Sequence, residues 1–330
     1  MALATSHKTI NIGLLGLGTV GTGVLKVLRD NHDDITRRTG VHFRVVAASA
    51  RDLSKDRGVD LSGISVSSDP FEVVNHPQVE VVIELMGGLE PAQAVIETAL
   101  KAGKSVITAN KAVMARHGET LVHLAETHGV SLLCEAAVAG AIPIVKSLRE
   151  GLAANQVTAL AGIINGTCNF ILTEMQRRGV EFEPILKEAQ ALGYAEAEPS
   201  FDIDGIDAAH KLTLLATMAF GMPLSFKHIV TGGIGAVTSA DIRYADELGY
   251  RIKSLGLAQR SDEGVALSVL PTLIPKSHLL SSITGVTNSV MVQGSAAAQT
   301  IYAGPGAGSL ATASAVVADL IEVARGTVVP

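Results

Sequence analysis

Aromatic residues are scarce in this chain of 330 residues: they make up 3% of it, and tryptophan is absent. A protein that binds single-stranded nucleic acid stacks bases on aromatic side chains and attracts phosphates with a basic surface. Here the net charge is −6, so the second requirement is missing as well. The two shortages argue against nucleic acid as a partner.

Cysteine and long apolar runs are equally scarce. Cys134 and Cys168 show neither a metal-ligand spacing nor a disulfide framework, which suits a reducing cytoplasm. The longest apolar run, "GVSLLCEAAVAGAIPIV", is interrupted by Glu135 and Pro143 and is too short to span a bilayer. The opening "MALATSHKT" lacks the apolar core of a signal peptide. We therefore expect a cytoplasmic protein with no membrane association.

What the chain does contain is enough apolar material for two cores. Hydrophobic residues make up 47% and charged residues 18%, which is typical of a packed globular protein, and 330 residues favour two domains. Apolar strands alternate with helical segments in the first part, which predicts a Rossmann-type, doubly wound parallel sheet. The predicted strands are residues 9–15, 42–49, 79–85, 105–110 and 131–136.

The pattern changes after about residue 140. Helices are predicted over 142–151, 168–178, 183–192 and 204–220, and two antiparallel strands, 251–259 and 265–274, flank the turn "RSDEG". This predicts an α+β substrate and dimerisation domain with a mixed sheet. Near the end, a glycine loop opens a helix with Ser309 as its expected N-cap, and this helix could pack back on the first domain. We expect a nucleotide-binding domain over 1–140, completed by 305–330, and a second domain over 141–304.

A dinucleotide site is predicted directly after the first strand. Gly16, Gly18 and Gly21 form G-x-G-x-x-G between a strand and a helix, the context in which this motif binds a pyrophosphate. The first glycine permits the tight turn, the second lets the backbone approach the phosphates, and the third lets helix and strand pack closely. The predicted site also includes the intervening Leu17, Thr19 and Val20.

The second strand ends in "AASARD", where an NAD-binding protein would place an acid against the ribose hydroxyls. Arg51 stands there instead, with Lys55 and Arg57 nearby, and a guanidinium suits a 2′-phosphate. We therefore favour NADP. NAD stays open because Asp52 would reach the same place if the strand ended one residue later.

Two lysines, Lys211 and Lys111, are candidate catalytic residues. Asp207 and Lys211 lie one turn apart on a helix face that Leu214 and Met218 continue as an apolar stripe. An exposed pair would contribute little, but a partly buried ammonium beside a carboxylate can exchange a proton with a carbonyl oxygen. Lys111 follows the strand "SVITAN", at the strand end where ligands of such sheets bind, although a surface lysine is equally plausible there.

Polar groups for a small amino acid surround that helix in the sequence. "GYAEAEPSFDIDG" holds four acids, Glu196, Glu198, Asp202 and Asp204, of which one or two could bind a substrate ammonium while the rest stay solvated. In "INGTCNF", Asn165-Gly166 precedes a helix whose backbone N–H groups could hold a carboxylate.

The segments "GLGTVG", "TANK", "INGTCNF", "GYAEAEPSFDIDGIDAAHKL" and "GPGAG", in this order, strongly resemble homoserine dehydrogenase over nearly the whole chain. The resemblance implies NADP- or NAD-dependent interconversion of L-homoserine and L-aspartate 4-semialdehyde in amino-acid biosynthesis. It implies Lys211 as proton donor, Asp207 beside it on the substrate hydroxyl, and Lys111 in contact with nicotinamide and substrate. It further implies substrate binding by Glu196, Tyr194, Asp202, Gly166 and Thr167, a 2′-phosphate ligand in Arg51, and closure over the cofactor by Gly308.

The resemblance also implies features that the residues alone do not reveal. "CEAAVAGAIP" is similar to the sodium site of the family, which would use Glu135, Val138, Gly140 and Ile142, largely through main-chain oxygens. The family suggests that the glycine-rich stretch 285–305 packs against a second subunit in a homodimer. Members often carry a C-terminal regulatory domain of the ACT type, whereas this sequence stops at Pro330, so we expect a short form or a shortened chain.

Two other functions compete with this interpretation. An acylating aldehyde dehydrogenase would use Cys168 as a thiolate nucleophile, since the cysteine lies near a helix start that would lower its pKa. The sequence shows no obvious base for it, and His210 is one candidate. A small packing cysteine is the simpler interpretation. A non-catalytic NADP sensor would bind cofactor without turnover, and it would need no Asp207–Lys211 pair.

Overall fold

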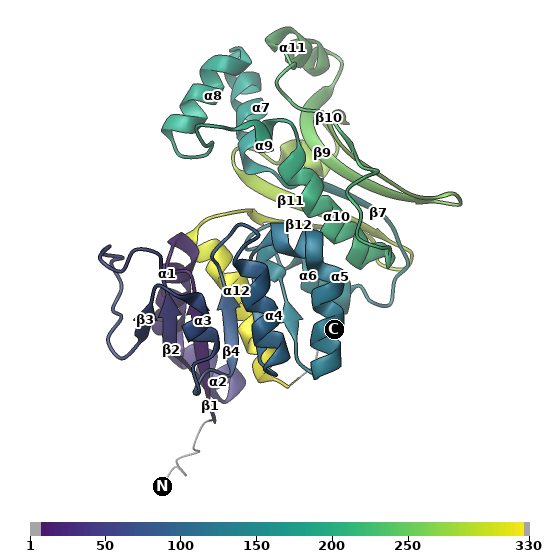
Figure 1. Ribbon diagram of the computed structural model, residues 1–330. Coiled ribbons are helices and arrows are strands. Elements are labelled where there is room, and N and C mark those ends of the chain that lie inside the picture. Colours follow the sequence, from purple (N-terminus) through teal and green to yellow (C-terminus); the bar gives the residue numbers. More distant parts are fainter. Residues whose placement is uncertain (1–7, 327–330) are drawn as a thin grey trace. The chain divides into compact units, whose positions relative to one another are not determined.

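The computed structural model describes residues 8–326, which form two compact units. Unit 1 contains the chain up to Ala141 and again from Gly308, and unit 2 is Ile142–Ala307 (Figure 1). The ends of the predicted first domain, residues 1–7 and 327–330, lie outside the described residues, as does most of "MALATSHKT". No helix within 8–326 is long and apolar enough to cross a membrane.

The described part of unit 1 is built on a six-stranded sheet in the order β3-β2-β1-β4-β5-β6, with every neighbouring pair parallel. This is the strand order of doubly wound dinucleotide-binding folds, so the predicted fold class is confirmed. The strands are β1 (Lys8–Leu15), β2 (Val41–Ser49), β3 (Ser65–Ser67), β4 (Val81–Glu84), β5 (Ser105–Thr108) and β6 (Leu132–Leu133). The helices are α1 (Thr19–Asp30), α2 (His32–Thr39), α3 (Pro70–Val74), α4 (Ala92–Lys101), α5 (Lys111–His128), the 3₁₀ turn η1 (Glu135–Ala137) and α12 (Ser309–Ala324).

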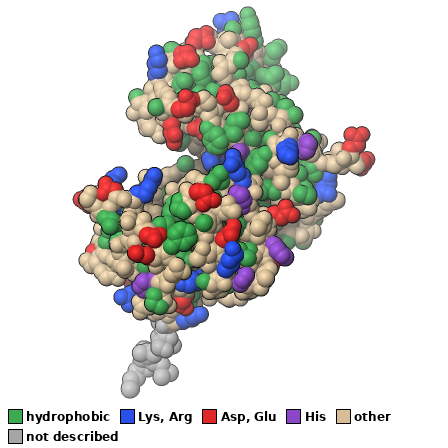
Figure 2. Space-filling view, in the orientation of Figure 1, with side chains coloured by type: hydrophobic (Ala, Val, Ile, Leu, Met, Phe, Trp, Pro, Cys, Tyr) green, Lys and Arg blue, Asp and Glu red, His purple; other side chains and the backbone are tan. Residues whose placement is uncertain are grey.

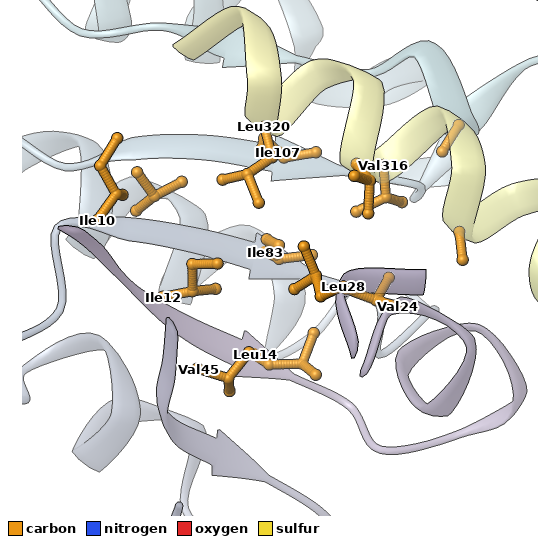
Figure 3. Packing of buried hydrophobic residues seen from close by; sticks show 14 of the residues in the cluster. Ile10, Ile12, Leu14, Val24, Leu28, Val45, Ile83, Ile107, Val316 and Leu320 are labelled. Atoms are coloured by element: carbon orange, nitrogen blue, oxygen red, sulfur yellow. The ribbon is translucent and has the colours of Figure 1, made fainter. Parts of the chain in front are cut away.

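The core of unit 1 joins segments from both ends of the chain. Ile12 and Leu14 of β1, both fully buried, pack with Val24 of α1 and with Val316 and Leu320 of α12 (Figure 3). Burying a side chain of this size contributes roughly 1.5–3 kcal/mol. Helix α12 therefore belongs to the same hydrophobic core as the first strand.

The start of α12 differs from the expected one. Gly308, at φ +122°, is the N-cap residue, and Ser309 is the first residue of the helix. The Ser309 hydroxyl donates instead to the carbonyl oxygen of Thr19 at 2.6 Å. A Cβ on Gly23 would lie 2.6 Å from the carbonyl oxygen of Ser309, so glycine is required for this close approach of α1 and α12. Glycine rather than a capping side chain stands at the N-cap because the chain enters α12 with a positive φ, which glycine adopts without strain.

Several boundaries in unit 1 also differ from the predicted ones. The strand expected over 131–136 is only Leu132–Leu133, because the chain turns at Glu135–Ala137. Helix α5 begins at Lys111, where the Asn110 side chain caps it by accepting from the N–H of Val113 at 3.2 Å. Asparagine is a strong N-cap residue, and this signal was overlooked.

The described part of unit 2 contains a second six-stranded sheet in the order β12-β11-β7-β9-β10-β8. The pair β8–β10 is parallel and the other pairs are antiparallel, so the predicted mixed sheet is confirmed. The strands are β7 (Val157–Ile163), β8 (Val230–Thr231), β9 (Tyr250–Ser261), β10 (Gly264–Pro275), β11 (Thr287–Gly294) and β12 (Ala298–Pro305). The helices are α6 (Ile144–Lys146), the π-helix η2 (Ser147–Gly151), α7 (Gly166–Arg178), α8 (Phe182–Ala191), α9 (Ser200–Ile203), α10 (Ile206–Phe220), α11 (Ser239–Glu247) and the 3₁₀ turn η3 (Leu279–Ser282).

The β9–β10 hairpin was predicted, whereas β7, β11 and β12 were not. The sequence of β11, "TNSVMVQG", mixes amide and hydroxyl side chains into both faces and lacks a clean apolar alternation. Its pairing with β12 is set by the short turn after Gly294, where Asn155 accepts from the N–H groups of Ala296 and Ala297 at 2.9 and 2.7 Å. Contacts between distant segments, not local pattern, define these strands.

Candidate functional site

The turn between β1 and α1 is shaped by glycine. Gly16 has φ +99°, and a Cβ there would lie 2.7 Å from the carbonyl oxygen of Leu85. A Cβ on Gly21 would overlap the carbonyl oxygen of Gly16, whereas around Gly18 no atom lies within 4 Å of where a Cβ would be. Helix α1 begins with no side-chain cap, so its first N–H groups are left to water or to an anion.

The three residues between these glycines hold the turn in place. Leu17 is 5% exposed, and its side chain and that of Val20 pack on the core of unit 1. The carbonyl oxygen of Thr19 accepts from Ser309, which places Gly308 beside the start of α1. An uncapped helix start, an open approach over Gly18 and two glycines that exclude side chains fit a dinucleotide pyrophosphate.

In the loop after β2, the two residues that could contact the ribose or its 2′-phosphate, Asp52 and Arg51, differ in their hydrogen bonding. The Asp52 carboxylate accepts from both the N–H and the hydroxyl of Ser54, at 2.9 and 2.6 Å, and these bonds lower its pKa. Arg57 is committed to main-chain oxygens, including that of Leu17 at 3.1 Å. Arg51 is exposed at the end of this strand. The acid is thus engaged within its own loop, while the arginine is exposed to solvent.

The ends of β4 and β5 carry a buried polar network. Glu84, fully buried, accepts from the N–H of Met86 at 2.8 Å and from the hydroxyl of Thr108 at 2.6 Å. Asn110 donates to the carbonyl oxygen of Gly88 at 2.7 Å while it caps α5. The network fixes the first turn of α5, and Lys111 is the first residue of that helix. This places Lys111 at the carboxyl edge of the parallel sheet of unit 1.

In unit 2, the charged pair on α10 is shielded from water, as its apolar surroundings in the sequence suggested. Lys211 Nζ donates to Asp207 Oδ2 at 2.8 Å and to the carbonyl oxygen of Ile164 at 2.9 Å. The exposed fraction of the side chain is 14% for Lys211 and 3% for Asp207. The ammonium is therefore held in a fixed position at the end of β7, with part of it accessible.

The turn between β7 and α7 connects this pair to a second carboxylate. The Asn165 amide donates to Asp202 Oδ1 at 2.7 Å and to Asp207 Oδ2 at 2.9 Å. Its oxygen accepts from the N–H of Cys168 at 2.8 Å and so caps α7. One buried side chain thus orders two carboxylates and a helix start, and the sequence indicated only the turn.

The remaining predicted substrate residues lie along the same turn and the loop after α8. The Thr167 hydroxyl donates to the carbonyl oxygen of Tyr194 at 2.6 Å and lies 3.4 Å from Asp202 Oδ2. Gly166 is the first residue of α7. Glu196 is exposed two residues after Tyr194. The structure thus gathers Thr167, Asp202, Asp207 and Lys211 around Asn165, with Glu196 in the adjoining loop.

Cys168 is not in the state that a nucleophile requires. Its thiol is fully buried and donates to the carbonyl oxygen of Asp202 at 3.2 Å. Burial raises the pKa of the thiol, and the neighbouring carboxylates of Asp202 and Asp207 raise it further. The expectation that the helix start would lower this pKa is wrong, because desolvation outweighs the helix dipole. The expected base, His210, packs its ring against Phe201 and Phe226.

Three of the four residues of the expected sodium site belong to unit 1, and the fourth, Ile142, belongs to unit 2. Glu135 is buried and its N–H donates to Asp319 Oδ2 at 2.9 Å, Val138 is fully buried, and Gly140 has φ +56°. Ile142 opens unit 2, and its carbonyl oxygen accepts from the N–H of Ile144 at 2.8 Å. Among residues 8–326, no group of three or more His, Cys, Asp or Glu side chains is placed to hold a metal ion.

Charge is interspersed over the visible surface of both units, with acidic and basic side chains next to one another (Figure 2). Three polar residues whose partners the sequence did not reveal are instead buried within the units. Glu84, Asn165 and Lys253 are all buried. Glu84 lies inside the apolar run "VVIELM", a signal that could have found it, whereas Lys253 stands in the mixed segment "YRIKSLG" and gives no such signal.

Comparison with known proteins agrees with this arrangement. A family model described as "Homoserine dehydrogenase, NAD binding domain" matches residues 16–135, and one described as "Homoserine dehydrogenase" matches residues 143–321. The homoserine dehydrogenase of Neisseria gonorrhoeae is 52% identical over 96% of this chain and 73% of its own length. That of Pseudomonas aeruginosa is 51% identical over the same shares. The chain thus spans about three quarters of the length of these relatives.

Solved structures lead to the same family. A homoserine dehydrogenase from Thiobacillus denitrificans superposes with a TM-score of 0.93 at 54% identity, covering 96% of this chain and 74% of that one. A hyperthermophilic archaeal homoserine dehydrogenase in complex with NADPH gives 0.82 at 27% identity, covering 97% and 98%. On these matches, and with the glycine turn and the shielded Lys211 in place, the chain belongs to the homoserine dehydrogenase family of NAD(P)-dependent oxidoreductases.

Proposed function

We propose that this chain interconverts L-homoserine and L-aspartate 4-semialdehyde with Lys211 as the proton donor and acceptor. The observation that carries the proposal is the Lys211–Asp207 pair, 2.8 Å apart and largely shielded from water. When bound, the nicotinamide cofactor would supply or take up the hydride at the terminal carbon of the substrate. The residues of the chain must then handle the proton on the oxygen.

The surroundings of Lys211 suit that task. Asp207 and the carbonyl oxygen of Ile164 accept hydrogen bonds from the ammonium and fix its direction. In aldehyde reduction the ammonium gives its proton to the forming alkoxide, and in alcohol oxidation the neutral amine takes it back. A positioned acid–base group of this kind contributes roughly 10²–10⁴-fold to the rate.

The rest of the substrate would be held at the start of α7 and in the loop before α9. The N–H groups of Gly166 and Thr167 begin α7, where a carboxylate is favoured. Glu196, together with Asp202, would bind the substrate ammonium, and Tyr194 would line the pocket. Lys111, in unit 1, would contact both nicotinamide and substrate. These roles follow the family resemblance and the placement of the residues within their own units.

For the cofactor, we propose a preference for NADP over NAD. Gly16, Gly18 and Gly21 would hold the pyrophosphate, with Gly308 beside the start of α1. The exposed Arg51 is available for a 2′-phosphate, whereas Asp52 is engaged by Ser54. Replacing Arg51 by alanine should raise the KM for NADP about tenfold and leave that for NAD unchanged, since one charge-assisted contact is worth roughly 1.5–3 kcal/mol.

We propose that the chain forms a homodimer through 285–305. Leu257, Met291 and Ile301 are partly buried and lie in one cross-strand row, in which the buried Ala161 stands between Leu257 and Met291. Gly256 faces Leu212 of α10, so these neighbours point away from that helix. Sedimentation of the Met291→Lys variant should show monomers where the parent chain shows dimers.

We also propose sodium at the main-chain oxygens of Glu135, Val138, Gly140 and Ile142, a site that rests on the family resemblance alone. Main-chain oxygens are suitable ligands for a hard cation. Activity measured in sodium, potassium and choline chloride at equal ionic strength tests it: equal rates in all three would remove the assignment.

A spectrophotometric assay tests the proposed function. The parent chain is supplied with L-homoserine and each oxidised cofactor in turn, and formation of reduced nicotinamide is followed. L-Serine serves as the matched control because it is one methylene shorter. Turnover with homoserine and not with serine supports the proposal, and no reduction with either cofactor overturns it. Near-normal turnover of Cys168→Ser would separate this reaction from acylating chemistry.

A further inference from the structure

Lys253 is a fully buried lysine in the middle of β9, with an exposed fraction of 1%. Its ammonium donates to the amide oxygen of Asn169 at 3.0 Å and to the carbonyl oxygen of Ile283. Both acceptors are uncharged, and burial lowers the pKa of Lys253 to about 8. A buried ammonium costs free energy that hydrogen bonds only partly offset, so an apolar side chain would serve a purely structural role better.

One acceptor of Lys253, the carbonyl oxygen of Ile283, begins a strap, residues 283–288, that lies along α7, and the other, Asn169, is on α7 itself. Lys253 holds its first residue, Ile283, and Asn169 donates to the carbonyl oxygen of Thr287 at 3.1 Å. Between these two points, the N–H of Gly285 donates to the hydroxyl of Thr173 at 3.2 Å. Asn169 and Thr173 are one turn apart on the same face of α7, so the strap is attached to that face at two points and to β9 at a third, through Lys253.

The strap also touches the turn that carries the proposed substrate site. A Cβ on Gly166 would lie 3.0 Å from the carbonyl oxygen of Val286, and Asn288 donates to the carbonyl oxygen of Ile163 at 2.9 Å. The next residue, Ile164, provides the main-chain acceptor of Lys211. The strap therefore contacts the turn 163–167 at Ile163 and Gly166, separately from the hydrogen bonds of Asn165 with Asp202 and Asp207.

We propose that Lys253 is a positioning residue for substrate binding: through the strap it holds the N–H groups of Gly166 and Thr167 in the orientation that receives the substrate carboxylate. The inference rests on the proposed function. It assigns Lys253 no contact with substrate. The bond between Lys211 and Asp207 does not depend on the strap, because both residues lie on α10.

Substitution by methionine, which keeps the length and volume of the side chain, tests this inference. Lys253→Met should raise the KM for homoserine about tenfold, with kcat and the KM for NADP each within twofold of the parent. The matched control is Lys104→Met, since Lys104 is a partly buried lysine of unit 1 that also donates to two carbonyl oxygens, those of Val74 and His76. The control should leave the KM for homoserine unchanged.

Thr173→Val provides a second, milder variant, since it removes the acceptor of the Gly285 N–H without changing volume. It should raise the KM for homoserine about threefold, and it keeps the inference testable if Lys253→Met does not fold. An unchanged KM for homoserine in a folded Lys253→Met variant overturns the inference. An equal loss of kcat and of NADP affinity does so too, because it indicates general loosening.

Hydrogen exchange makes the test independent of turnover. Amides of the peptide 163–170 should exchange at least tenfold faster in Lys253→Met than in the parent, and no faster in Lys104→Met. If the parent chain fails to turn over homoserine, the proposed function fails, and this comparison alone decides whether Lys253 orders the turn. Equal exchange in the parent and in Lys253→Met overturns the inference.

Discussion

Each unit has one strand-to-helix turn at its proposed site, and the two turns are built in opposite ways. The turn from β1 to α1 is defined by missing side chains: Gly16 and Gly21 leave no room for a Cβ, and α1 starts without a cap. The turn from β7 to α7 is defined by one side chain, Asn165, which caps its helix and orders two carboxylates. The first turn suits an anionic ligand such as a pyrophosphate, because it offers backbone N–H groups and no charged side chain. The second turn orders charged side chains that can contact their ligand.

Removing the ammonium next to the second turn should give the largest effect. Lys211→Met should lower kcat about 10³-fold, since general acid–base catalysis contributes roughly 10²–10⁴-fold, and should leave the Kd for NADP within twofold. Steady-state kinetics and fluorescence titration of the cofactor measure the two quantities. Lys187→Met, at an exposed lysine on α8, is the control. A variant that keeps a tenth of the parent kcat would show that another group handles the proton.

Adding a methyl group at Gly21 should disrupt the turn from β1 to α1. Gly21→Ala should weaken NADP binding about 100-fold and destabilise unit 1 by about 2 kcal/mol, because its Cβ would overlap the carbonyl oxygen of Gly16 and force the backbone apart. Titration with NADP and urea unfolding measure both effects. Wild-type affinity in this variant would contradict the role given to close packing.

The two tasks of Asn165 can be separated by substitution. Asn165→Ser keeps a capping oxygen and loses both donors to Asp202 and Asp207, so kcat should fall about tenfold. Asn165→Ala loses the cap as well and should cost about 1 kcal/mol more in unfolding free energy, with no further fall in kcat. Kinetics and denaturant unfolding of both variants test this separation. Equal kcat in the parent and Asn165→Ser would show that the amide donors are dispensable.

Gly18→Ala should give the smallest effect and distinguishes a folding role from a binding role within the first turn. No atom lies within 4 Å of where its Cβ would be, so the unfolding free energy should change by less than about 0.5 kcal/mol. The added methyl group would instead meet the pyrophosphate and weaken NADP binding about fivefold. A loss of stability larger than the loss of affinity would reverse this assignment.

The contrast between the two turns also explains what sequence could predict. The glycine turn is a local motif, since all three glycines lie within six residues and their steric reasons are known. The Asp207–Lys211 pair is local too, because one helical turn separates its members. The fold class of unit 1 follows from the alternation of strands and helices along the chain, which is also a local signal.

The second turn depends on contacts between distant segments, which a single sequence does not show. Asn165 meets Asp202 and Asp207 only once α7, α9 and α10 have packed, and Lys253 meets the strap only once β9 and β11 share a sheet. The same reason explains why the alternative of a thiolate at Cys168 fails, while the simpler interpretation of a packing cysteine fits its burial. Its place near a helix start is visible in the sequence, whereas its burial depends on packing.

The two-part construction of unit 1 has a consequence for synthesis. On the ribosome, the apolar surface of α1 and β1, including Val24 and Ile12, emerges early, while Val316 and Leu320 of α12 follow only after all of unit 2 has been translated. Throughout that interval the nascent nucleotide-binding unit presents an unfilled groove. Chaperones that recognise exposed aliphatic side chains would meet it there, and a translation arrest before residue 309 would leave the groove permanently open to proteolysis.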